Sequence, residues 1–523
     1  MASKTLFQSL RGMLLPAADT RNEAGGLAYT LPPKHALAQY AATGCLNATF
    51  YASADEQLAT VLELCKQVEP EFIARTALYA RSKGYMKDLP ALLCAVLASR
   101  GPGLLAEVFD RVIDDAKMLR NFVQIIRSGV TGRKSLGTLP KRLVLQWFEA
   151  RDDAAIFRAS VGNDPSLADV IKMVHPKPAT KGREALFGYL IGRPHNAADL
   201  PEIVMQYEAF KAQTATLVPD VPFQMLTSLP LSEANWKDIA RNAPWQMTRM
   251  NLNTFARHGV FADAELARLI ADRLRNPELI VKAKVFPYQL MVAYTTVDAA
   301  VPQIVREALQ DAMEVAISNV PRVKGDVYVF VDVSGSMQSP VTGHRTGSTT
   351  AVRCLDAAAL LAASIVRQNP HATVLPFSDD VVYATLNPRD SVMSNAKLLA
   401  SLPSGGTNCS APLKELNRRQ LRQGLEPILV YVSDNQSWID SPLNATGQAT
   451  ATMKEWSAFK ARNPSAKMVC VDIQPYGTVQ AQDRPDVLNI GGFSDRVFDV
   501  IAKFADGTLG ADHWVGVIEA MAI

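Results

Sequence analysis

The character of the sequence changes at Pro321, and this change limits the folds that the chain can adopt. From residue 56 to residue 317, apolar side chains recur with the spacing of amphipathic helices in one segment after another. After Pro321, short apolar runs rich in β-branched residues alternate with helical segments. The chain is therefore predicted to be a multidomain protein, with a helical domain over residues 1–320 and an α/β domain over residues 321–523.

The helical domain is expected to be an α-solenoid, because its many short helices must bury their apolar faces against their neighbours. The breaks between them carry Gly or Pro, as at Gly101-Pro102-Gly103. No clean sequence period is visible, so an irregular helical bundle stays open as the alternative. The predicted helices cover residues 56–68, 71–83, 89–99, 103–117, 119–128, 138–150, 166–174, 183–191, 200–212, 248–257, 262–275, 286–297 and 301–317.

The α/β domain is predicted to be a doubly wound, mainly parallel sheet, since short buried strands alternate with helices. The predicted strands cover residues 326–333, 372–377, 427–432 and 467–473. The predicted helices cover residues 355–367, 453–462 and 495–504.

Polar residues follow the predicted strands of this sheet, where ligands of parallel sheets gather. Asp332, Ser334 and Ser336 leave the first strand, Thr407 lies in a Gly-rich loop, and Asp434 leaves a later strand. Hydroxyl and carboxylate oxygens suit a small hard dication, so these residues are predicted to bind Mg²⁺, with Mn²⁺ as the second choice. Since few carboxylates would contact the metal directly, it could also take an acidic group from a protein partner. A metal-free relic of such a site is the alternative.

Basic residues are concentrated in one part of a nearly neutral chain. The whole sequence has 54 Lys and Arg against 51 Asp and Glu, a net charge of +3. Residues 116–193 alone hold 14 basic and 6 acidic residues, an excess of 8. Such a local excess suggests an anionic partner, although a solvated surface would have the same composition.

Several classes of protein are not supported by the sequence. The six cysteines are scattered and form no C-x-x-C pair, which argues against a zinc knuckle or a disulfide framework and favours a reducing compartment. Residues 1–12 have no apolar core of signal-peptide length, and no apolar run could span a bilayer, so a cytoplasmic protein is expected. Residues 129–135 lack the G-K-[ST] ending of a phosphate loop. We expect no enzymatic activity and assign no catalytic residue.

Three segments near the N-terminus carry a resemblance to a known family. They read Asn22-Glu23-Ala24-Gly25-Gly26-Leu27-Ala28-Tyr29, Gly44-Cys45-Leu46-Asn47-Ala48-Thr49-Phe50-Tyr51 and Tyr79-Ala80-Arg81-Ser82-Lys83-Gly84-Tyr85-Met86-Lys87-Asp88-Leu89-Pro90. In this order they resemble the opening of the TROVE module of Ro autoantigen proteins, and His175-Pro176-Lys177-Pro178 resembles a later part of it. The D-x-S-x-S, Thr and Asp pattern resembles the metal-ion-dependent adhesion site of von Willebrand factor A domains. A TROVE module followed by such a domain is the Ro architecture, and the length is typical of a bacterial member.

The resemblance implies a fold and a function. It implies a ring of HEAT-like helical repeats, the TROVE module, closed by a von Willebrand factor A domain. It implies that single-stranded 3′ ends of misfolded RNAs bind in the ring and that a small Y-like noncoding RNA binds on its basic outer surface. It also implies roles in RNA quality control and processing, with an exoribonuclease as a possible protein partner. The protein itself is expected to be monomeric and to have no membrane partner.

The basic segment fits this role, because neutralisation of phosphates by Lys and Arg supplies RNA affinity that does not depend on sequence. A metal-dependent adaptor for proteins, with an incidental basic patch, is the alternative function. The residues predicted to contact RNA are Arg120, Arg127, Arg133, Lys134, Lys141, Arg142, Lys172, His175, Lys177 and Lys181.

Overall fold

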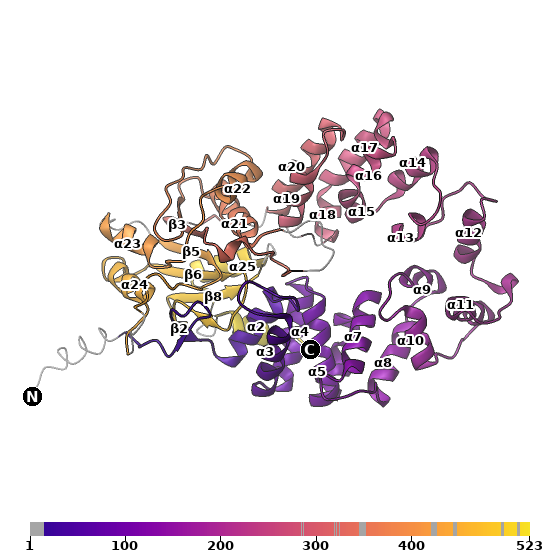
Figure 1. Cartoon of the computed structure of the whole chain (residues 1–523), viewed down its shortest axis with the longest axis horizontal. Helices are drawn as coiled ribbons and strands as arrows, with labels where there is room; N and C mark the ends of the chain where they lie inside the picture. The colour runs from indigo at the N-terminus through magenta and orange to yellow at the C-terminus, as the bar shows by residue number, and fades with distance from the viewer. Residues whose placement is uncertain are drawn as a thin grey trace, which may run out of the picture. The chain divides into compact units, whose positions relative to one another are not determined.

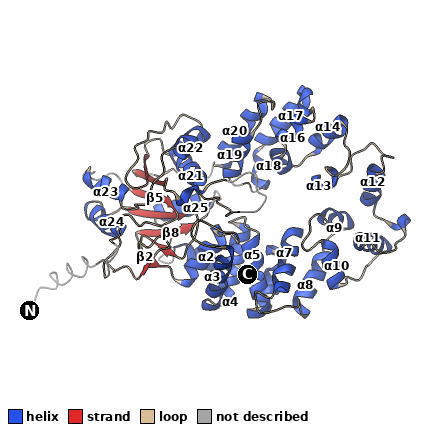
Figure 2. Cartoon of the chain, in the orientation of Figure 1, coloured by secondary structure: helices blue, strands red, loops and turns tan. Residues whose placement is uncertain are grey.

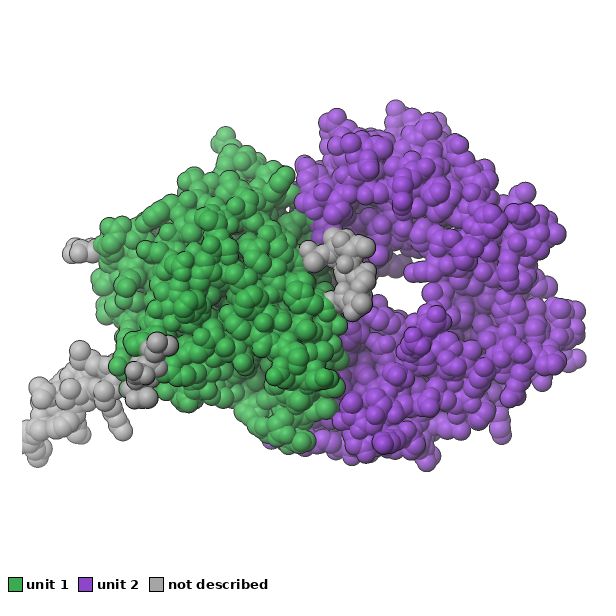
Figure 3. All heavy atoms as spheres, viewed as in Figure 1, with its two compact units in different colours: residues 1–68, 286–291, 316–520 green, residues 69–285, 292–315, 521–523 purple. Residues whose placement is uncertain are grey.

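The computed structural model divides the chain into two compact units (Figure 3). The first unit comprises residues 1–68, 286–291 and 316–520, and the second comprises residues 69–285, 292–315 and 521–523. The structure describes residues 15–283, 285, 287–317, 320, 322–323, 325–344, 352–419, 426–442, 447–492, 496–509 and 513–523, so the segment examined for a signal peptide lies outside the described residues.

A parallel sheet of five strands forms the centre of the first unit (Figure 2). The strand order is β4-β3-β5-β6-β8, and each neighbouring pair is parallel. The strands β3, β5 and β6 are completely or almost completely buried, which explains their continuous apolar sequences. Their bounds are β3 (Val327–Asp332), β4 (Thr373–Phe377), β5 (Ile428–Ser433), β6 (Lys467–Asp472) and β8 (Val487–Gly491).

Helices cover both faces of this sheet (Figure 1). Alternate side chains of the strands, such as Phe330 and Tyr431, join one apolar cluster with α23 and α24. The Ala-rich helix α21 packs on β3 and β5. The remaining described helices of this unit include α22, α25 and α26. The helix bounds are α21 (Cys354–Gln368), α22 (Val392–Ala400), α23 (Ala411–Arg418), α24 (Ala451–Arg462), α25 (Arg496–Ala505) and α26 (His513–Glu519).

The N-terminal segment completes the α/β unit. Its strands β1 (Thr20–Arg21) and β2 (Leu27–Thr30) form a small antiparallel sheet with β7 (Thr478–Val479). Tyr29 and Leu31 belong to the apolar cluster of the α/β unit. The helix α2 (Pro33–Thr43) packs on β8, and α3 (Ala54–Gln67) packs on α2. The compact α/β unit therefore includes residues well before Pro321.

The turn that precedes β2 contacts the α/β unit closely. The Asn22 side chain donates to the Ser437 carbonyl at 2.6 Å and accepts from the Gly26 N–H at 2.8 Å. A Cβ at Gly26 would overlap the Ser437 carbonyl oxygen, whereas a Cβ at Gly25 would enter open space. Gly26 is thus required for close approach, while Gly25 is favoured because its φ is +85°.

We expect Gly26→Ala to destabilise the α/β unit by about 1–3 kcal/mol, because the added methyl group overlaps backbone that cannot move aside freely. Chemical unfolding followed by the fluorescence of the buried Trp456 and Trp514 should show the loss. Gly25→Ala is the matched control, with an expected cost of about 1 kcal/mol from backbone strain alone. If the two substitutions lowered the free energy of unfolding equally, the close contact at Gly26 would contribute nothing to stability.

The second unit is built of helices, many of which bury one apolar face, whereas α5 (Asp88–Arg100) is buried on all sides from Leu89 to Ala98. In α7, Met118, Phe122 and Ile126 share the buried face, Asp115 caps the first turn, and Gly129 ends the helix in the left-handed region. Neighbouring helices pack on one another, as α4 on α5 and α5 on α7. The helices are α4 (Pro70–Ser82), α5 (Asp88–Arg100), α6 (Pro102–Val112), α7 (Ala116–Ser128), α8 (Thr138–Glu149), α9 (Asp153–Ala159), α10 (Leu167–Val174), α11 (Lys181–Ile191), α12 (Glu202–Lys211), α13 (Phe223–Leu226), α14 (Glu233–Asn242), α15 (Trp245–Met250), α16 (Leu252–Arg257), α17 (Ala264–Arg275), α18 (Pro277–Ala283) and α20 (Gln303–Ala316). The division between the two units passes through α19 (Pro287–Thr296).

The predicted fold class, a helical region followed by a doubly wound α/β domain, is confirmed. The helix predicted over residues 248–257 is in fact two helices, α15 and α16, which meet at Asn251. The helix predicted over residues 103–117 ends at Val112, because Asp115 begins a new helix as its N-cap. None of the described helices combines the length and the apolar character needed to cross a bilayer.

Candidate metal centre and basic groove

The carboxyl end of β3 positions three of the predicted metal ligands. Asp332 is the last residue of the strand, and its Oδ1 accepts a hydrogen bond from the Ser334 N–H at 2.8 Å. This turn directs Ser334 and Ser336 to the same side, with 3.2 Å between their hydroxyl oxygens. The Gly335 N–H donates to the Gly405 carbonyl at 2.9 Å and links this turn to the Gly-rich loop.

The other two predicted ligands come from neighbouring loops. Thr407 follows that Gly-rich loop, and Asp434 follows β5, the strand next to β3. The Ser336 hydroxyl lies close to the Asp434 carboxylate and lowers its pKa, against the larger effect of burial. The exposed fractions of the five predicted ligands do not exceed 3%: Asp332 0%, Ser334 0%, Ser336 3%, Thr407 2% and Asp434 1%. The structure therefore brings Asp332, Ser334, Ser336 and Asp434 together, and the Gly335–Gly405 hydrogen bond holds the loop that carries Thr407 beside them.

The electrostatics of this cluster favour a cation. Burial raises the pKa of Asp332, and burial together with the nearby Asp332 carboxylate raises the pKa of Asp434 to about 7. The Asp434 Oδ2 atom is buried and has no hydrogen-bond partner. A small hard dication fits these two buried carboxylates and three hydroxyls. It would remove the repulsion between the carboxylates and would give the Asp434 Oδ2 atom a partner. Mg²⁺, or Mn²⁺ in its place, would be held by the five residues and would supply an electrophilic centre.

Three further residues contact or approach this cluster and were not predicted. The Ser433 hydroxyl donates to Asp332 Oδ2 at 2.6 Å and holds that carboxylate in place. The Tyr51 hydroxyl, from the N-terminal segment, lies close to Ser336. Asp472 ends β6 and is fully buried, and the Asp434 charge helps to raise its pKa after the larger effect of burial. The position of Asp472 at a strand end was visible in the sequence, whereas no local signal could place Tyr51 near Ser336.

In the helical unit, a shallow groove of about 770 Å³ brings four of the predicted RNA-binding residues together. Arg127 comes from the last turn of α7, Lys134 from the following turn, and Lys141 and Arg142 from the first turns of α8. Among the described residues, no carboxylate lies within ion-pair distance of Lys134, Lys141 or Arg142. Their positive charge is therefore left for an anionic ligand.

The N-terminus of α8 adds to this electropositive character. Gly137 stands at its N-cap and supplies no side-chain hydrogen bond, and the first turn holds no acidic residue. Unpaired N–H groups and the helix dipole favour an anion at such a terminus. The Arg127 guanidinium lies 3.1 Å from the sulfur of Met173, which also lines the groove.

The remaining predicted RNA contacts divide into two groups. Lys172, His175, Lys177 and Lys181 are exposed at the end of α10 and the start of α11. Arg120 and Arg133 instead stabilise the fold. Arg120 donates to the carbonyls of Ala159 and Val161, and Arg133 donates to those of Ala98 and Leu136. The exposed residues are available to a ligand, and the two arginines hold loops in place.

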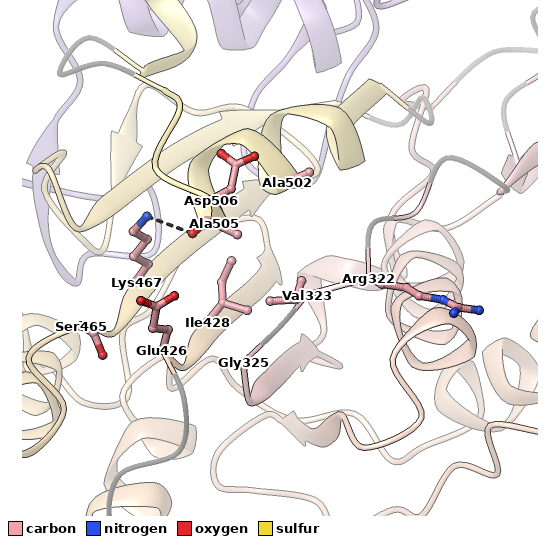
Figure 4. A pocket seen from close by; sticks show the side chains of 10 residues that line it. All are labelled: Arg322, Val323, Gly325, Glu426, Ile428, Ser465, Lys467, Ala502, Ala505 and Asp506. Atoms are coloured by element: carbon pink, nitrogen blue, oxygen red, sulfur yellow. Dashed lines mark hydrogen bonds between the residues drawn. The ribbon is translucent and has the colours of Figure 1, made fainter.

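A second hollow, of about 670 Å³, lies at the opposite end of the parallel sheet (Figure 4). Its lining includes Ile428 and Lys467, the first residues of β5 and β6. Lys467 donates to the carbonyls of Phe504 and Ala505 at 2.7 and 3.0 Å, and so caps the end of α25. Lys467 is therefore already hydrogen-bonded within the protein. Ligands of parallel sheets bind at the carboxyl ends of the strands, and this hollow lies at the amino ends, so we assign no function to it.

Comparisons with known proteins agree with this architecture. Residues 327–505 match the Ro60 von Willebrand factor A domain family. The RNA-binding protein RO60 of Deinococcus radiodurans is 24% identical over 538 aligned positions, which cover 94% of this chain and 96% of that protein. Its name is that of an RNA-binding protein and not of an enzyme. The crystal structure of the D. radiodurans Ro (RSR) protein has the same fold, with a TM-score of 0.60 at 19% identity, and the match covers 91% of this chain and 100% of that one. Over nearly its whole length the chain is therefore similar to a bacterial Ro protein in sequence and in fold.

Proposed function

We propose that this protein is an RNA-binding scaffold that takes small structured RNA and single-stranded RNA 3′ ends. The observation that carries the proposal is the groove in which Arg127, Lys134, Lys141 and Arg142 meet. Phosphate groups are the ligand that such a cluster fits best, because four cations and a helix N-terminus converge on one surface. The D. radiodurans relative is an RNA-binding protein by name, which supports RNA as the polyanion.

The chemistry of the groove fits recognition by shape and charge. Its cations can follow a phosphate backbone without reading bases, and the exposed His175 ring offers a surface on which a base can stack. A Y-like small RNA and the 3′ ends of misfolded or immature RNAs are the ligands that the Ro resemblance suggests. In the same proposal the protein acts in RNA quality control and processing in the cytoplasm, with an exoribonuclease as protein partner.

A binding assay with two RNAs tests this proposal. One RNA is a hairpin with a single-stranded 3′ tail, and the other is the same hairpin with a blunt end. We expect the full chain to bind both, to bind the tailed RNA about tenfold or more tightly, and to lose affinity steeply as salt is raised. Equal, weak and salt-independent binding of the two RNAs would reject RNA as the ligand. It would favour the alternative, a metal-dependent adaptor for proteins.

A further inference from the structure

The segment Gly44–Tyr51 covers the candidate metal centre from within the same chain. The Tyr51 hydroxyl lies close to Ser336, one of the five predicted ligands. The Tyr51 ring packs edge-on against Tyr476, with 5.4 Å between the ring centroids. The Asp332 and Asp434 charges both act on the Tyr51 hydroxyl, which places it close to the two carboxylates.

Further contacts hold the same segment against the loop that carries the ligands. The His344 N–H donates to the Ala48 carbonyl at 2.7 Å, and the Asn47 side chain donates to the Thr342 carbonyl at 2.9 Å. Any Cβ at Gly343 would contact Cys45, Asn47 and Ala48. The Tyr476 hydroxyl lies close to Thr49. The segment is therefore held against the loop that follows Ser336 and against Tyr476.

These contacts explain why the ligand cluster is buried. An adhesion site that grips a partner's acidic group needs an open face through which that group can reach the metal. Here the five ligands are at most 3% exposed, and the phenol that lies close to Ser336 belongs to the protein itself.

We infer that Tyr51 takes, within the chain, the place at which an external acidic group would reach a cation held by Asp332, Ser334, Ser336, Thr407 and Asp434. The centre then acts as an intramolecular clamp. Metal binding fixes residues 44–51 on the α/β unit, and docking of these residues shields the metal. This inference does not depend on RNA binding, and its test uses no RNA.

Manganese binding to the full chain tests the inference directly, with free Mn²⁺ measured by electron paramagnetic resonance. We compare the wild type with Tyr51→Phe, which keeps the ring and removes the hydroxyl. We expect the variant to bind Mn²⁺ about three- to tenfold more weakly, since one polar contact is lost. We expect added acetate to restore its affinity and to leave that of the wild type unchanged, because a free carboxylate can reach only the opened site.

Tyr476→Phe is the matched control. It alters the other ring of the same pair, whose hydroxyl donates to Gln474 at 2.7 Å and hydrogen-bonds no predicted ligand. Its Mn²⁺ affinity should stay within about twofold of the wild type and should not respond to acetate. Acetate that tightens Mn²⁺ binding to the wild type as strongly as to Tyr51→Phe would overturn the inference and favour an open adhesion site. An unchanged affinity in Tyr51→Phe, without a response to acetate, would also overturn it.

A second measurement needs no variant. Cys45 lies in the covering segment and is partly exposed, whereas Cys65, Cys94, Cys354, Cys409 and Cys470 are buried. If the metal fixes this segment, saturating Mg²⁺ should slow alkylation of Cys45 several-fold. The slowing should be much smaller in Tyr51→Phe. An alkylation rate that does not respond to Mg²⁺ in the wild type would contradict the clamp.

Discussion

Removal of the four groove cations should lower RNA affinity on the order of 10³-fold at 0.1 M salt. The variant carries Ala at Arg127, Lys134, Lys141 and Arg142. Each phosphate contact contributes about 0.7–0.9 to the slope of log affinity against log salt, so four lost contacts reduce the slope by about 3–4. At 1 M salt the contribution of these contacts to log affinity vanishes. A tenfold drop in salt to 0.1 M, with slopes that differ by about 3–4, therefore separates the two affinities by a factor on the order of 10³. A salt titration with a fluorescent hairpin RNA measures both quantities.

Two controls make the result specific to the groove. The first replaces four basic residues elsewhere in the helical unit by Ala and so removes the same total charge: Lys211, Lys237, Arg241 and Lys282. The second is Asp332→Ala, which disables the candidate metal centre and leaves the groove intact. Both should retain RNA affinity within about threefold. If the charge-matched control loses as much affinity as the groove variant, RNA binding reflects net charge and the groove is not the site.

Arg133 offers a further comparison within the same turn. Its guanidinium is directed at the carbonyls of Ala98 and Leu136 and stands against Gly137, so it shapes the turn from which Lys134 projects. The sequence could not separate the roles of these two adjacent basic residues. Both lie in a Gly-flanked turn of the basic segment, and only the fold decides that one faces the protein and the other faces solvent.

The strands of the α/β unit were predictable because burial on both faces leaves an unusual sequence pattern. β3 and β5 appear as continuous apolar runs, each followed at once by polar residues. β8 was missed, since its sequence VLNIG contains Asn489, whose buried amide donates to the Ala481 carbonyl at 2.9 Å and to Asp483. A polar residue that is satisfied only by distant parts of the chain cannot be recognised as a core residue in advance.

The helices of the second unit were predictable where one face alone is buried. α2 was missed for the opposite reason, since all of its residues from Ala36 to Thr43 are buried and leave no periodic pattern. α14 was missed because it buries only Trp236, Ile239 and Ala240 in a polar sequence. Regular apolar spacing thus signals a helix when one of its sides meets water. α5 was predicted although Leu89–Ala98 are all buried, because its apolar run is long and lies between clear breaks.

In the candidate metal centre, too, contacts between neighbouring residues could be predicted from the sequence, whereas contacts between distant residues could not. The turn from Asp332 to Ser336 is encoded locally, because the aspartate accepts a hydrogen bond from the backbone two residues ahead. The contact of Tyr51 with Ser336 joins residues 285 positions apart and follows only from the way the N-terminal segment packs. Residues 22–29 likewise carry a resemblance to the helical module and yet pack in the α/β unit, where Asn22 and Tyr29 are buried.

Metal removal should make the stability of the α/β unit fall as pH rises. In the metal-free protein the pKa of Asp434 is about 7, far above its ordinary value of 3.8, and burial shifts the pKa of Asp332 in the same direction. The folded state then holds a proton that the unfolded state has released, so stability is highest at low pH and is lost as pH rises from about 4 to about 7. Bound Mg²⁺ requires the ionised carboxylates, and at 100 times its dissociation constant it adds about 2.7 kcal/mol.

Thermal unfolding at pH 5 and pH 8, with EDTA or with Mg²⁺, measures both effects together. We expect Mg²⁺ to raise the midpoint much more at pH 8 than at pH 5, because protons compete with the metal at the lower pH. Asp434→Asn is the matched variant, since it keeps the shape of the side chain and cannot ionise. It should be less sensitive to pH than the wild type in EDTA, and Mg²⁺ should not stabilise it. If Mg²⁺ stabilises the wild type equally at both pH values, the cation binds elsewhere. The same conclusion follows if Mg²⁺ raises the unfolding midpoint of Asp434→Asn.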